Sequence, residues 1–132
     1  MKRIIRTLLT LFAIVFISAL GIAAQKPQRI QFEKGKSSAV VKASTGQYGI
    51  TYVIRARSGQ KLVLDLTPAT KVGIKVETIG RFGETVLLRE ESGGRYEVGL
   101  EETGDYTIFI GSIGNKPVSF TLAVAITKLA DI

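Results

Sequence analysis

The chain has 132 residues, no cysteine, no histidine and a formal net charge of +7. This length suits one domain rather than two. The lack of cysteine and histidine excludes disulfides, hydrolases that use a histidine base, cysteine nucleophiles and zinc sites built on these residues.

Residues 1–24 have the parts of a secretory signal peptide. Three basic residues precede an apolar run from Leu8 to Ile17, and small residues cluster directly after it. This pattern predicts cleavage on export, a single mature domain over residues 25–132 and a periplasmic or secreted protein. Membrane contact is then expected only through the signal peptide. The alternative is an uncleaved membrane anchor, because the apolar stretch reaches the lower limit of a span, roughly 17 residues.

Charge is distributed unevenly along the mature sequence. Residues Lys26–Lys75 carry a net charge of +8, whereas Val76–Ile132 carry −4. Such a dipole can steer an acidic partner to one face of the protein. The alternative is a surface in which unlike charges of different strands lie side by side. Nucleic acid is not an expected partner, because no segment reads as a helix dense in lysine or arginine.

From residue 29 onward, apolar residues alternate with polar ones, and turn-forming residues separate the alternating segments. These segments are 29–35, 38–46, 48–60, 61–68, 71–80, 84–90, 94–102, 105–112 and 118–127. A period of two is typical of strands with one buried and one solvated face. The predicted fold class is all-β, an antiparallel, jelly-roll-like β-sandwich of about eight or nine strands after an N-terminal signal helix. The last residues, 127–132, are expected to fray.

Catalytic chemistry has little support in the sequence. Glu90 and Glu91 are adjacent, as are Glu101 and Glu102, and adjacent residues on a strand point to opposite faces. No acidic residues have the spacing of a calcium loop, and no glycine-rich loop leads into a helix. The protein is therefore predicted not to be an enzyme, with no catalytic residue, no metal site and no cofactor. An enzyme would require two carboxylates that the fold brings together across a cleft.

Binding is better supported, and three side chains in the first half are candidates for a partner site. Tyr48 lies between Gly46 and Gly49 at the start of a strand, where an aromatic ring can be displayed. Arg55 and Arg57 follow on the outward face of the same predicted strand, where two guanidinium groups can receive carboxylates or phosphates. Their alternative role is to pair with acids on neighbouring strands.

The segment from Gly111 to Pro117 joins the last two predicted strands. Its polar side chains, Ser112, Asn115 and Lys116, are further candidates for partner binding. A plain hairpin turn also accounts for the segment, since Gly-Asn tolerates positive φ and proline sets φ for the strand that follows. Both roles stay open at this point.

Two stretches resemble the periplasmic inhibitors of goose-type lysozyme. In Phe32–Leu66 the resemblance lies in an aromatic residue, Lys-Gly, Ser-Ala, a glycine-containing turn, a tyrosine-containing strand and Gly-Gln before an alternating strand. In Leu100–Ile110 it lies in the Gly-x-Tyr of the penultimate strand. The bacterial pre-peptidase C-terminal domains, which are secreted β-sandwich modules, share this layout.

The resemblance to the lysozyme inhibitors implies a β-sandwich whose loops enter the cleft of a muramidase. One such loop corresponds to the turn with Tyr48, and another to Gly111–Pro117, which is shorter here and carries Lys116 where the inhibitors have arginines. The function implied is an exported, non-enzymatic binding protein that inhibits a goose-type lysozyme. The alternative is an envelope-associated adhesion or scaffold module, like the pre-peptidase C-terminal domains, that binds peptidoglycan or another anionic envelope polymer.

Overall fold

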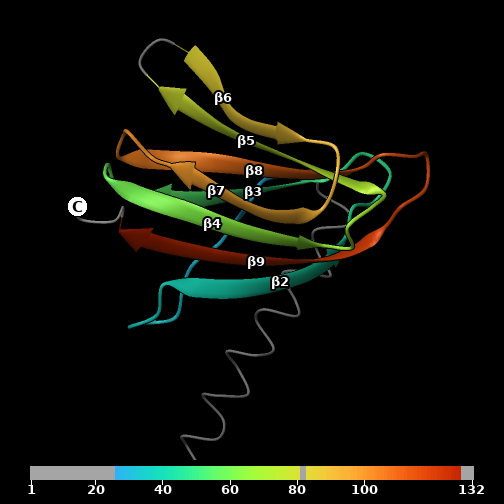
Figure 1. The fold of residues 1–132 in the computed structure, drawn as a ribbon, viewed down its shortest axis with the longest axis horizontal. Helices are drawn as coiled ribbons and strands as arrows, with labels where there is room; N and C mark the ends of the chain where they lie inside the picture. Colours follow the sequence, from blue (N-terminus) through green and yellow to red (C-terminus); the bar gives the residue numbers. More distant parts are fainter. Residues whose placement is uncertain (1–25, 81–82, 129–132) are drawn as a thin grey trace, which may run out of the picture.

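Two β-sheets pack against each other in the computed structural model, which describes residues 26–80 and 83–128 (Figure 1). In spatial order, the five-stranded sheet consists of β1 (Gln28–Arg29), β3 (Ile50–Ala56), β8 (Gly104–Ser112), β5 (Val72–Gly80) and β6 (Gly83–Glu90). The four-stranded sheet consists of β2 (Ser38–Ser44), β9 (Ser119–Lys128), β4 (Gln60–Thr67) and β7 (Gly94–Gly99). Within these residues, no helix is long and apolar enough to cross a membrane.

The all-β sandwich predicted from the alternation is confirmed. The predicted signal peptide and residues 129–132 lie outside the described residues. Fraying was predicted to begin at residue 127, which is too early. Thr127 and Lys128 belong to β9 and pair with Lys61 and Gln60 of β4.

The segment after β8 is not a hairpin turn, and that expectation is wrong. Both β8 and β9 are central strands: β8 is hydrogen-bonded to β3 and β5, and β9 to β2 and β4. Because both edges of each strand are occupied, the two strands have no edge left with which to pair. The segment therefore crosses from one sheet to the other, as do the other connections between the described strands except the β5–β6 hairpin.

The first strand also departs from the expected antiparallel arrangement. β1 pairs in parallel with β3, in the register Gln28–Tyr52 and Arg29–Val53. The Ile30 N–H continues this contact by donating to the Val53 carbonyl at 2.8 Å. The direction follows from the chain path, since β1 and β3 are separated by β2, which runs back along the other sheet.

The hydrophobic core lies between the sheets and is filled by the inward residues of the alternating strands. Burying one side chain of leucine or isoleucine size contributes about 1.5–3 kcal/mol to stability. The larger side chains with almost no exposure are Tyr106, Ile54, Leu62, Leu64, Leu66, Leu100, Ile108, Ile110, Leu122, Val72, Val76 and Val124.

One core side chain carries a polar atom without a partner. Tyr52 is 2% exposed, and its hydroxyl makes no hydrogen bond within the described part of the chain. The ring meets Phe120 edge to face, with 6.5 Å between the ring centroids. Burial raises the pKa of Tyr52 to about 12, because a phenolate would be poorly solvated there.

Two other tyrosines tie strand starts to the turns before them. The Tyr96 hydroxyl donates to the Ser92 carbonyl at 2.8 Å. The Tyr106 hydroxyl donates to the Glu102 carbonyl and accepts the Glu102 N–H at 3.3 Å. Each tyrosine thus bonds the backbone four residues upstream, as the tyrosine corner of β-sandwiches does. The Gly-x-Tyr pattern therefore serves the fold.

Candidate functional site: a loop edge with Tyr48

Strand register brings the turn with Tyr48 and the segment after β8 to one end of the sandwich. β3 begins at Ile50, which pairs with Ile110 near the end of β8. The segments on either side are tied together, since the Thr45 N–H donates to the Val118 carbonyl at 2.9 Å and the Val118 N–H donates to Thr45 Oγ1 at 3.0 Å. The structure therefore joins two of the predicted partner segments at one site.

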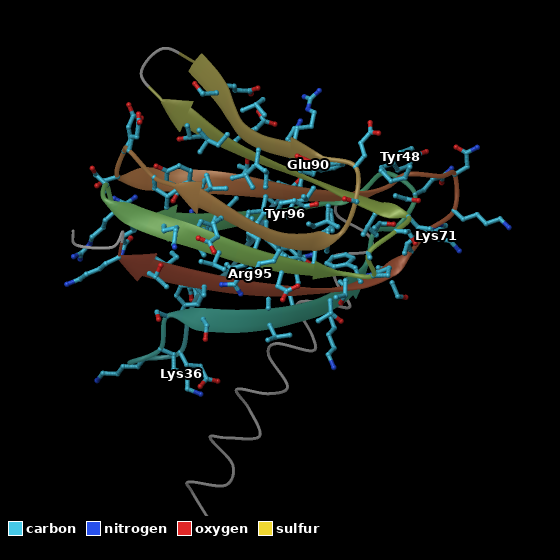
Figure 2. The ribbon with its side chains drawn as sticks, viewed as in Figure 1. Lys36, Tyr48, Lys71, Glu90, Arg95 and Tyr96 are labelled. Atoms are coloured by element: carbon cyan, nitrogen blue, oxygen red, sulfur yellow. The ribbon has the colours of Figure 1, made fainter. Side chains whose placement is uncertain are left out.

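A third segment, the one before β5, reaches the same place. The Ile113 N–H donates to the Lys71 carbonyl at 2.9 Å, and Figure 2 shows Tyr48 and Lys71 at the same end of the molecule. The sequence pattern predicted Lys71 to be a strand residue. It instead precedes β5 with a φ of 76°, which is uncommon for a residue other than glycine. We call Tyr48, Lys71 and the segment 112–117 the Tyr48 edge.

Phe109 supports the Tyr48 edge from the outer face of the five-stranded sheet. A Cβ added to Gly49 would overlap the Phe109 ring, and one added to Gly111 would lie 2.9 Å from its Cε1 atom. Lys75 Nζ lies 5.7 Å from the ring centroid, within range of a cation–π contact. Because Gly49 also has a φ of +85°, the chain can bring the ring of Phe109 against the backbone directly beside Tyr48.

The Tyr48 edge presents apolar and positively charged groups to solvent. Tyr48 is 69% exposed and Ile113 is 51% exposed. Among the ion pairs of the described residues, none involves Lys71 or Lys116. An aromatic and an aliphatic side chain beside two cations that have no ion pair within residues 26–80 and 83–128 form a surface that suits an acidic partner with an apolar groove.

The polar residues predicted in this segment have different roles. Ser112 Oγ–H donates to the Lys116 carbonyl at 2.7 Å, with the Gly114 carbonyl at 3.2 Å, so the side chain organises the segment itself. Asn115 and Lys116 are exposed. The positive φ expected at Gly114 and Asn115 is not observed. The described residues with positive φ lie at other positions. A crossing between sheets does not need the tight left-handed turn of a short hairpin.

Comparisons with known proteins bear on this geometry. The sequence matches no protein-family model and no curated protein. Among solved structures, it is similar to PliG, a periplasmic lysozyme inhibitor of g-type lysozyme. For Aeromonas hydrophila PliG the TM-score is 0.68 at 24% identity, over 77% of this chain and 96% of that chain. For Salmonella Typhimurium PliG it is 0.61 at 23% identity, over 77% of this chain and 98% of that chain.

A second group of solved structures shares the fold less closely. The pre-peptidase C-terminal domain of a collagenase from Bacillus anthracis has a TM-score of 0.50 at 12% identity, over 77% of this chain and 95% of that chain. The two resemblances expected from the sequence are therefore confirmed for the fold, and the inhibitors are the more similar of these two groups.

Arg55 and Arg57 lie at the other end of the sandwich. β3 runs from Ile50 to Ala56, so these arginines are about 20 Å along the strand from Tyr48. Arg57 lies just beyond the strand rather than on its outward face. The six predicted binding residues thus form two groups that cannot contact one small surface together. We call the end with Arg29, Arg55 and Arg57 the arginine end.

The expected pairing of one of these arginines with an acid is present. Arg55 Nη1 lies 4.0 Å from Asp105 Oδ1, a long contact because Arg29 already holds both carboxylate oxygens at 3.1 and 2.9 Å. These hydrogen bonds from Arg29 keep the pKa of Asp105 below its ordinary value and raise the pKa of the Arg29 guanidinium. Asp105 therefore stays ionised at neutral pH.

The uneven charge of the sequence does not become two oppositely charged faces. In the four-stranded sheet, strands from the basic first half alternate with strands from the acidic second half, and in the five-stranded sheet β3 from the first half lies beside β8 from the second. Ion pairs join the halves, as in Arg29–Asp105 at 2.9 Å and Lys61–Glu97 at 2.7 Å, and the latter lowers the pKa of Glu97. The surface therefore matches the alternative expected from the sequence, in which unlike charges of different strands lie side by side.

The acidic residues considered for catalysis are divided between the two ends. Glu90 pairs with Ile74 at the end of β6, near the Tyr48 edge, whereas Glu101, Glu102 and Asp105 lie around the start of β8 at the arginine end. Over residues 26–80 and 83–128, no three acidic side chains gather as metal ligands would.

Proposed function

We propose that this chain is an exported binding protein that inhibits a g-type lysozyme through the Tyr48 edge. The observation that carries the proposal is the meeting of Tyr48, Lys71 and Lys116 at one end of a fold that PliG also has. PliG is a periplasmic inhibitor of g-type lysozyme. Residues 1–24 would be the signal peptide, residues 25–132 the mature domain and the periplasm its location. The chain would act without catalysis and without a cofactor.

The proposal requires a lysozyme cleft that is acidic and partly apolar. Tyr48 and Ile113 supply the exposed apolar area, which a well-packed contact would remove from water. Lys71 and Lys116 would donate charge-assisted hydrogen bonds to carboxylates in the cleft. The segment 112–117 is short and carries one cation, Lys116. Lys71, from the segment before β5, would supply the second cation.

The test is a titration of g-type lysozyme activity with the mature protein. We expect inhibition with a dissociation constant of roughly 1 μM or tighter. Tyr48→Ala should weaken inhibition about 30-fold, as loss of a central aromatic contact does. Lys71→Gln and Lys116→Gln should each weaken it several-fold. Lys128→Gln is the matched control, since it removes the same charge from an exposed lysine at the other end of the sandwich and should leave inhibition unchanged.

Two outcomes would contradict this function. The first is full lysozyme activity at about 10 μM protein, ten times the weakest useful dissociation constant. The second is equal inhibition by the parent protein and the Tyr48→Ala variant. A parallel sedimentation assay with purified peptidoglycan at low and high salt tests the adhesion alternative. Salt-sensitive binding to peptidoglycan without lysozyme inhibition would favour that alternative.

A further inference from the structure

A cavity of about 450 Å³ lies at the arginine end, away from the Tyr48 edge. It is bounded by the end of β3, the segment between β1 and β2, the start of β4 and the end of β9. Arg55 and Arg57 line it together with the apolar side chains of Phe32, Ala56 and Ile126. A pocket of this size with a few convergent polar groups is typical of small-molecule sites.

The positive charge at this cavity is poorly neutralised. Arg55 has only the long 4.0 Å contact with Asp105, whose carboxylate is held in two shorter hydrogen bonds by Arg29. Arg57 has no carboxylate within 4.0 Å in the described part of the chain. Two guanidinium groups two residues apart therefore keep most of their capacity for an anion.

The neutral groups of the lining are already oriented by the fold. Gln60 Oε1 accepts the Arg57 N–H at 2.7 Å, which leaves the Gln60 amide N–H groups able to donate. Thr103 Oγ1 accepts the Ser58 N–H at 2.9 Å, so its own hydrogen is free to donate as well. Phe32 is half-buried and Ala56 and Ile126 are buried, so an apolar group beside the anion would find a preformed surface.

We propose that this cavity binds a carboxylate carried on a short apolar group, such as an N-acylated alanine or the C-terminal residue of a peptide. Arg55 and Arg57 would hold the carboxylate, Thr103 and Gln60 would donate to it, and Phe32 and Ile126 would contact the apolar group. A carboxylate suits the cavity better than a phosphate, because Asp105 stands beside Arg55 and opposes a second negative charge. This site goes beyond the proposed inhibition and does not depend on it.

The test is an NMR titration of the mature protein with N-acetyl-alanine, with N-acetyl-trialanine and with the carboxamide of each. We expect saturable shifts of the amides at residues 55–60, 103–104 and 126, with a dissociation constant of roughly 1 mM. The carboxamides should bind at least about tenfold more weakly, because they lack the charge that the arginines recognise. Binding of either acid supports the proposal. The acid that binds more tightly shows whether the cavity prefers a single acylated residue or the C-terminal residue of a peptide.

Matched variants locate the site. Arg57→Gln and Arg55→Gln should each weaken binding about tenfold, the effect of losing one charge-assisted hydrogen bond. Lys34→Gln makes the same charge change on an exposed residue near the cavity and should bind as the parent protein does. Unchanged thermal melting verifies that the variants are folded.

Three results would overturn the proposal. They are no saturable shift with either acid, equal binding of acid and carboxamide, and unchanged binding in both arginine variants. Tighter binding of inorganic phosphate than of N-acetyl-alanine would overturn the assignment to a carboxylate. The lysozyme titration measures a different end of the molecule, so the two proposals fail separately.

Discussion

The two ends of the sandwich are built from the same strands but differ in the exposure of their apolar side chains and in shape. At the Tyr48 edge, Tyr48 and Ile113 are exposed, and the cations Lys71 and Lys116 have no carboxylate partner among the described residues. At the arginine end, Arg29 is paired with Asp105, and Phe32 is half-buried beside a cavity. One end thus offers a protruding surface and the other a recess.

Backbone hydrogen bonds hold the crossing segments at both ends, and the arginine end adds an ion pair. At the Tyr48 edge, three segments that cross between sheets are tied by backbone hydrogen bonds such as Ile113–Lys71 at 2.9 Å. Backbone bonds hold the segments in place and leave their side chains free. At the arginine end, backbone hydrogen bonds such as Gly59–Leu100 at 2.9 Å also join the segments, and the side chains of Arg29 and Asp105 add a further tie. A surface whose segments are held by backbone contacts can vary its side chains without losing the fold.

Gly49→Ala should disturb the Tyr48 edge most. The added methyl group would collide with the Phe109 ring and would occupy a φ of +85°, so we expect a loss of about 3 kcal/mol in the free energy of unfolding. Gly46→Ala is the control, because Gly46 has a φ of +61° but no atom within 4 Å of the added Cβ. It should cost about 1 kcal/mol.

Urea denaturation of the two glycine variants measures this difference. If Gly46→Ala and Gly49→Ala lose the same stability, contact with Phe109 does not support the Tyr48 edge. The Gly49→Ala variant should also inhibit lysozyme less well, because Tyr48 is the adjacent residue.

One tyrosine corner lies at each end of the sandwich, so substitutions in the two corners allow the ends to be compared directly. Tyr106→Phe should lower the free energy of unfolding by about 1–2 kcal/mol, because it removes two hydrogen bonds to Glu102 from a side chain that is 1% exposed. Tyr96→Phe should cost less, about 0.5 kcal/mol, since Tyr96 is half-buried and water can replace its hydroxyl near Ser92. Chemical denaturation of both variants tests the order. A larger loss for Tyr96→Phe would contradict it.

Tyr52→Phe should have a smaller effect of opposite sign. Its buried hydroxyl has no hydrogen-bond partner among the described residues, so replacement should leave the stability at pH 7 unchanged or raise it by up to about 1 kcal/mol. The pKa of Tyr52 is raised to about 12 in the fold. The titration of Tyr52 therefore leaves stability unchanged below the unfolded pKa near 10, and stability falls as the pH rises from there toward 12.

Unfolding measured between pH 9 and pH 12 tests whether the pKa of Tyr52 is raised in the folded protein. The parent protein should lose stability over this range more steeply than Tyr52→Phe. Identical slopes for the two proteins would mean that Tyr52 titrates normally.

Asp105→Asn should produce the smallest change, at the arginine end. Pairing lowers the pKa of Asp105 from its ordinary 3.8. The contribution of the Arg29–Asp105 pair is therefore present above that value and is lost as the pH falls through the lowered value. The variant should be slightly less stable than the parent at pH 7 and should converge with it in acid. High salt should reduce the difference, because the pair is solvent-exposed.

Asp65→Asn is the control for this prediction, since Asp65 is exposed and makes no ion pair among the described residues. It should unfold with the pH dependence of the parent protein. A gap between the parent and Asp105→Asn that persisted in strong acid, where the carboxyl is protonated in both the folded and the unfolded state, would show that packing rather than charge is responsible.

Alternation alone was enough to predict most of the strands and their inward residues. Leu62, Leu64 and Leu66 are buried as their spacing requires, because side chains on a strand point to alternate faces. The exposure of Tyr48 was also readable from its glycine-flanked position. The distance between Tyr48 and Arg55 was implicit in the length of β3, and the structure places the two residues at opposite ends of the sandwich.

The sequence by itself determined that this chain forms a sandwich, and the tertiary structure decided which segments meet. Lys71 joins Tyr48 and Lys116 only because β5 and β3 both pair with β8. The segment after β8 crosses between sheets only because β8 and β9 are already paired on both edges. Periodicity records which face of a strand is buried, whereas the choice of neighbouring strand depends on contacts between residues far apart in the chain.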